Sequence, residues 1–98
     1  MNHTIREFQE LMEALYGDRD RKRGIDRSLI HLLTEIGELF EAFLKEDPES
    51  SREEAADVFA WLCSVCNLLD IDLEDATYQK YSYRCPKCDS NPCNCSPL

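Results

Sequence analysis

Four acidic residues lie in the most apolar stretches of the chain as two pairs, Glu35 with Glu38 and Glu54 with Asp57. On an α-helix, residues i and i+3 project from one face about one turn apart, so two packed helices would present four carboxylates to one gap. Charged carboxylates in an apolar region are costly unless a cation neutralises them. Magnesium prefers carboxylate oxygens and shares its coordination shell with phosphates. We therefore predict that these four acids bind Mg2+.

A solvated surface is the simpler explanation of an acidic pair spaced i, i+3 on a helix. This explanation would account for Glu35 and Glu38 if they were the only acidic pair. Glu54 and Asp57, in contrast, occupy the start of a segment that is otherwise apolar, and Asp57 lies beyond the first turn, where the helix dipole no longer favours an acid. The second pair therefore favours a metal site.

The first expected helix precedes the acidic pairs in the sequence. Apolar residues recur at helical spacing over residues 5–16, with Thr4 as the expected N-cap. Gly17 is expected to end this helix. Residues 18–24 are charged and end in a second glycine, a pattern that predicts an exposed loop.

Two longer helices are expected to carry the acidic pairs. Over residues 26–45 the apolar side chains form one stripe at helical spacing, which we expect to face the core: Leu29, Leu32, Leu33, Ile36, Phe40 and Phe43. Ser51 opens a capping box for a third helix, residues 51–69, which is apolar on nearly every side and is expected to be central and buried. Asp72 is expected to cap a fourth helix that continues to about residue 83. The predicted fold class is all-α, with about four helices.

The end of the chain is rich in cysteine. Four cysteines follow the last expected helix in the pattern C-x2-C-x4-C-x-C: Cys85, Cys88, Cys93 and Cys95. Their loop is too short and polar to fold by burial, and a tetrahedral thiolate site for structural zinc would supply the missing folding energy. Disulfides and an iron–sulfur cluster are the alternatives. Cys63 and Cys66 also form a C-x2-C pair, but on the buried third helix we expect them to be small core residues.

Size and charge exclude several classes of function. A chain of 98 residues can form only a small core, which favours oligomerisation. We divide it into a helical domain, residues 1–83, and a Cys-rich tail, residues 84–98. A net charge of −9, from 11 basic and 20 acidic residues, argues against binding of nucleic-acid polymers. No segment has the length and apolarity of a membrane span and no signal peptide is evident, so we expect a cytoplasmic protein that does not bind membranes.

The acidic pairs also carry a resemblance to a known family. The sequence EIGEL at residues 35–39, followed by EAADV at residues 54–58, resembles the ExxE and ExxD motifs of the MazG-like all-α nucleotide pyrophosphohydrolases, and the similarity extends over roughly residues 5–83. Many members have a further glutamate just before the first motif, where this chain has Thr34.

The resemblance implies an activity as well as a fold. It implies hydrolysis of a nucleoside triphosphate to the monophosphate and pyrophosphate, by a MazG-like helical bundle that forms a homodimer or homotetramer. The catalytic magnesium would be bound by the four acids already named: Glu35, Glu38, Glu54 and Asp57. Metal-bound water would attack phosphorus, and a carboxylate not saturated by metal would take its proton.

Three residues are weaker candidates for binding the nucleotide. His31 lies one turn before Glu35 on the same helical face and could contact a phosphate or metal-bound water, although a hydrogen-bonded histidine between helices is the simpler explanation. Trp61 could stack on a base, or it could belong to the core. Lys80 matches a basic residue that the family carries near the end of its last helix. The basic residues around the expected loop are either solvated or a phosphate lid: Arg19, Arg21, Lys22, Arg23 and Arg27.

Two other classes of protein stay open at this point. A di-iron or di-manganese carboxylate bundle also needs acids on facing helices, but such proteins use Glu-x-x-His pairs, and neither His3 nor His31 follows a glutamate by three residues. A noncatalytic interaction module would use its zinc tail to contact a partner and would carry the acids on its surface. Magnesium binding by the acids distinguishes the hydrolase from the module.

Overall fold

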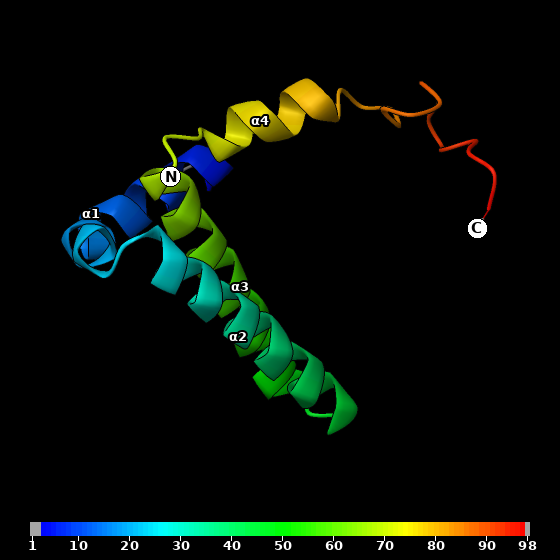
Figure 1. Ribbon diagram of the computed structural model, residues 1–98. Helices are drawn as coiled ribbons and strands as arrows, with labels where there is room; N and C mark the ends of the chain where they lie inside the picture. The colour runs from blue at the N-terminus through cyan, green and yellow to red at the C-terminus, as the bar shows by residue number, and fades with distance from the viewer. Residues whose placement is uncertain (1–2, 98) are drawn as a thin grey trace.

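The computed structural model describes residues 3–97 as four helices without a strand among them. The helices are α1 (Ile5–Arg23), α2 (Ile25–Leu44), α3 (Pro48–Leu68) and α4 (Leu73–Lys80). In Figure 1, α2 and α3 run side by side in opposite directions, α1 crosses them near one end, and α4 leads away toward the tail. The prediction of an all-α fold with about four helices is confirmed. Within the described residues, no helix combines the length and the apolarity needed to cross a membrane.

The first helix is longer than the sequence suggested. It passes through Gly17, which is buried, and ends only at Arg23, where the following Gly24 caps the helix with a φ of 86°, a conformation that glycine adopts readily. The prediction that residues 18–24 form an exposed loop was therefore wrong. One reason is that opposite charges spaced i, i+3 lie on the same face of a continuing helix, where Asp20 forms an ion pair with Arg23 at 2.8 Å.

The caps explain where the other helices begin. The side chain of Asp47 accepts a hydrogen bond from the Ser50 N–H at 3.2 Å, so α3 begins at Pro48, and the predicted start at Ser51 was wrong. Thr4 and Asp72 cap α1 and α4 as predicted. The fourth helix ends at Lys80 rather than near residue 83.

Helix α3 lies at the centre of the fold and packs against both α1 and α2. Its most buried residues form one continuous segment: Cys63, Ser64, Val65 and Cys66. The predictions of a central third helix and of two core cysteines are confirmed. Burial is greatest in the second half of α3, whereas the half that carries Glu54 and Asp57 lies nearer the solvent.

The apolar stripe of α2, which we expected to face the core, is largely uncovered in the single chain. Five of its side chains are 41% to 69% exposed: Leu29, Leu33, Ile36, Phe40 and Phe43. The expectation was wrong for these five residues because α3 covers only one side of α2 and α1 contacts mainly α3. A row of large apolar side chains in water is unfavourable, and such surfaces mark contacts with partners.

Candidate metal centre

Helices α2 and α3 bring three of the four predicted ligands together. One carboxylate oxygen from each of Glu35, Glu38 and Glu54 lies within 4.8 Å of the others. The first two residues are one turn apart on α2, and the third faces them from α3 because the short connection between the helices reverses the chain. The gap between the two helices therefore presents oxygen ligands from both sides.

Two of these oxygen atoms are buried and unsatisfied. Among the described residues, Oε2 of Glu35 and Oε2 of Glu54 have no hydrogen-bond partner. Burial is the main reason that the pKa of Glu35 is raised to about 7, and the adjacent Glu38 adds to the effect. Burial also raises the pKa of Glu54, and the nearby charges of Glu38 and Asp57 add to the shift. A cation in the gap would satisfy both oxygen atoms and reduce the repulsion, so these acids fit a hard divalent metal ion.

Asp57, the fourth predicted ligand, lies beside this group rather than within it. Its charge is one of the influences that raise the pKa of Glu35, so it acts on the same site. Its side chain lines an adjoining cavity of about 270 Å³ between α1 and α3. Asp57 therefore lines the cavity and also acts through its charge on the acidic group.

Aromatic and basic side chains surround this cavity. Trp61 lines it and stacks on His31, with ring centroids 4.7 Å apart and planes 8° from parallel. The Cζ atom of Arg23 lies 4.7 Å from the Trp61 ring centroid. Two of the weaker sequence candidates, His31 and Trp61, are thus in contact. Lys80 does not line the cavity, and its Nζ atom lies 5.7 Å from the ring centroid of Tyr81.

Sequence reasoning underestimated Arg23, because it placed this residue in a loop. The structure fixes it in the last turn of α1, where Asp20, only 2% exposed, binds its guanidinium group. The carboxylate oxygen Oδ2 of Asp20 is buried and has no hydrogen-bond partner in the described part of the chain. The spacing of Asp20 and Arg23, three residues apart and of opposite charge, is the signal that could have identified this pair.

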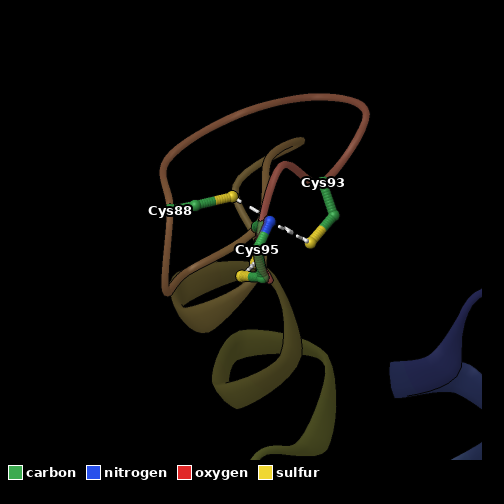
Figure 2. A group of neighbouring side chains, drawn as sticks. Cys88, Cys93 and Cys95 are labelled. Carbon is green, nitrogen blue, oxygen red and sulfur yellow. Dashed lines mark hydrogen bonds between the residues drawn. The ribbon is translucent and has the colours of Figure 1, made fainter. Parts of the chain in front are cut away.

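The four cysteines of the tail form a second candidate metal group. All four Sγ atoms lie within 4.8 Å of one another. Figure 2 shows Cys88, Cys93 and Cys95 directed toward a common centre. A hydrogen bond from the backbone of Asn94 is the main reason that the pKa of Cys88 is lowered to about 6, whereas hydrogen bonds with other cysteines raise the pKa of Cys95 to about 12. The cluster could hold a metal ion.

The four helices bring a group of acidic side chains together between α2 and α3, and this group could hold a metal ion. A sequence model of the MazG nucleotide pyrophosphohydrolase domain matches residues 23–89. Because the match covers more than half of the chain, the protein belongs to the MazG nucleotide pyrophosphohydrolase family. The matched segment contains all four predicted acidic ligands. No curated protein matches the chain.

Proposed function

We propose that the protein is a magnesium-dependent hydrolase that converts a nucleoside triphosphate into the monophosphate and pyrophosphate. The observation that supports this most is the meeting of Glu35, Glu38 and Glu54 across the gap between α2 and α3, with two buried oxygen atoms unsatisfied. Membership of the MazG family supports a nucleotide as the substrate. The acidic group and the family membership together favour a magnesium-dependent hydrolase over a noncatalytic interaction module.

The acids of the gap and Asp57 are the proposed magnesium ligands. When bound, Mg2+ would neutralise charge on the phosphates and lower the pKa of a coordinated water. Hydrolysis would add the oxygen of a water to the α-phosphorus and break the bond from this phosphorus to the bridging oxygen, so that pyrophosphate would leave with the electron pair. A carboxylate of the gap that is not engaged by the ion accepts the proton of the water.

The cavity beside Asp57 is the proposed site for the rest of the nucleotide. Trp61 forms part of the wall of this cavity, and Arg23 supplies a positive charge in a chain whose net charge is −9. A planar guanidinium group binds phosphate oxygens through two parallel hydrogen bonds, which suits a triphosphate lying across the metal gap. His31 supports Trp61 from α2 by stacking.

The uncovered stripe of α2 is the proposed interface with a second copy of the chain. Five large apolar side chains on one helical face would become buried if two copies paired through α2. Each fully buried leucine or phenylalanine stabilises such an interface by roughly 1.5–3 kcal/mol before the cost of association. A homodimer, or a homotetramer built from two such dimers, follows from this proposal.

A di-iron or di-manganese site receives no support from the arrangement. The acidic group between α2 and α3 contains no histidine, and His31 stacks on Trp61. Such bundles normally ligate their metals with histidine as well as carboxylate. The tail cysteines do not belong to the hydrolase site, because magnesium prefers oxygen to sulfur.

The decisive experiment incubates the protein with a panel of nucleoside triphosphates and Mg2+, and measures pyrophosphate and orthophosphate separately. We expect pyrophosphate and the nucleoside monophosphate in equal amounts. Orthophosphate as the sole inorganic product would contradict cleavage between the α- and β-phosphorus. Calorimetric titration with Mg2+ completes the test, because absence of both magnesium binding and hydrolysis would support the interaction module instead.

A further inference from the structure

We propose that Cys85, Cys88, Cys93 and Cys95 bind one Zn2+ ion in a closed tetrahedral site that folds the tail. The Sγ atoms of Cys85 and Cys95 lie 3.7 Å apart, and those of Cys88 and Cys93 lie 4.0 Å apart. With a Zn–S bond of about 2.3 Å, the edge of a regular tetrahedron of sulfur atoms is about 3.8 Å. These two separations fall on either side of that value, and all four Sγ atoms lie within 4.8 Å of one another, so the group is close to the size that one zinc ion requires.

Backbone hydrogen bonds prepare two of the sulfur atoms to carry negative charge. The N–H of Asn94 donates to Sγ of Cys88 at 3.1 Å, and the N–H of Cys95 donates to Sγ of Cys93 at 3.4 Å. Figure 2 shows the second of these bonds inside the turn of the loop. Such donors stabilise thiolates over thiols, and the thiolate is the form that binds zinc.

Over its described residues, the tail lacks a hydrophobic core that could stabilise this conformation. The residues between the cysteines are small, polar or proline, and both Cys93 and Cys95 are exposed to solvent. In Figure 1 this segment extends beyond the end of α4, away from the packed helices. Burial of apolar surface therefore cannot supply its folding energy, whereas a metal bound by four thiolates can.

The chemistry of the ligands selects the metal and its role. Thiolates are soft ligands that favour zinc over magnesium, and four of them complete a tetrahedral shell without a free position for water or substrate. The family match ends at residue 89, between Cys88 and Cys93, so the complete site lies only partly within the matched domain. The zinc site is therefore structural and separate from the acidic site.

The bound ion would stabilise several contacts that now bridge the loop. The side-chain amide of Asn91 donates to the carbonyl oxygen of Tyr83 at 2.7 Å, and the N–H of Cys85 donates to the carbonyl oxygen of Ser90 at 2.9 Å. Arg84 forms an ion pair with Asp89 at 3.3 Å. Because these contacts close across the cysteine loop, we expect loss of zinc to release residues 83–95 and to leave the four helices folded.

The test uses the full chain, purified under reducing conditions, and measures zinc per chain by mass spectrometry. We expect one zinc ion in the unaltered protein. Cys88→Ser should abolish most of the zinc, whereas the control Cys66→Ala, which removes a cysteine from the C-x2-C pair of α3, should keep it. Circular dichroism should show that both variants retain their helices, so that loss of metal is not confused with loss of fold.

A second measurement does not depend on any variant. Cobalt added to the reduced, metal-free protein should give the visible absorption of tetrahedral cobalt bound to four thiolates, and added zinc should displace it. Hydrogen exchange of residues 83–95 should slow on addition of zinc. Reduced protein that binds neither metal would overturn the proposal, as would disulfides joining Cys85 to Cys95 and Cys88 to Cys93, or stoichiometric iron with acid-labile sulfide.

Discussion

The guanidinium group of Arg23 lies over the indole ring of Trp61, with Cζ 4.7 Å from the ring centroid. This contact joins the last turn of α1 to α3, one turn beyond Asp57. An interaction of a cation with an aromatic face is worth about 0.5–2 kcal/mol. The buried carboxylate of Asp20 binds the same guanidinium group, so the charge of Arg23 is held at the cavity that Asp57 also lines.

Replacement of this arginine tests whether it binds the substrate. Arg23→Lys keeps the positive charge but removes the planar group that can bind Asp20 and a phosphate together. We expect kcat/KM to fall by roughly tenfold, equivalent to about 1.4 kcal/mol, mainly through a higher KM. Steady-state rates of pyrophosphate release over a range of nucleotide concentrations measure this change.

Arg21→Lys is the matched control for this substitution. Arg21 lies two residues earlier on α1 and binds Glu13 and Asp18 on an exposed face, outside the cavity. Exposed ion pairs contribute little, so its KM should stay within about twofold of the unaltered protein. Equal effects of the two substitutions would show that Arg23 has no special role.

Removal of one acid from the gap tests the magnesium site. Glu54→Gln keeps the size of the side chain but removes the only ligand that α3 contributes to the group of three. Because a bound metal ion stabilises the transition state by several kcal/mol, we expect a loss in kcat of roughly 100-fold or more, and weaker binding of Mg2+. Calorimetry and the pyrophosphate assay measure the two effects.

The neighbouring acid provides the control for that experiment. Glu53→Gln makes the same chemical change one residue earlier, at an exposed position outside the acidic group. Its activity and magnesium affinity should stay close to those of the unaltered protein. If Glu54→Gln retained full activity under the same conditions, the proposed site would be wrong.

The stability of the metal-free protein should depend on pH through Glu35. Its pKa is raised from an ordinary 4.5 to about 7, so between these pH values the folded chain binds more protons than the unfolded chain. Stability therefore falls as pH rises through this window. We expect a lower Tm at pH 8 than at pH 5 without metal, and recovery at pH 8 when Mg2+ is added.

Glu35→Gln shows whether this residue causes the effect. The amide cannot ionise, so the fall in Tm between pH 5 and pH 8 should become smaller, and the gain from Mg2+ should decrease as well. Differential scanning calorimetry at several pH values, with and without Mg2+, measures both quantities. An unchanged pH profile would mean that another group titrates in this range.

A charge placed on the stripe of α2 should separate the proposed oligomer. Leu33→Glu puts a carboxylate on a side chain that is 69% exposed in the single chain and would be buried between two copies. We expect sedimentation analysis to show monomers for this variant and dimers or tetramers for the unaltered protein. Leu15→Glu makes the same change on α1, where the leucine is 57% exposed, and should leave the assembly intact.

Local patterns were sufficient for much of the fold. Thr4 and Asp72 cap their helices as predicted, because capping depends on a few neighbouring residues. The pairing of Glu35 with Glu38 on one helical face follows from helical geometry alone. Gly17 does not end α1 as predicted. The residue is buried within a continuous helix, where packing outweighs the low helix propensity of glycine.

The sequence by itself determined the class of fold, the acidic pairs and the clustering of four thiols, since each depends on spacing along the chain. The tertiary structure decided which distant groups meet. It brought Glu54 to the pair on α2, set Asp57 at the border of a cavity, and placed Arg23 over Trp61. It also left one side of α2 uncovered. These results depend on how helices cross and which faces they cover, and helical periodicity alone does not specify either.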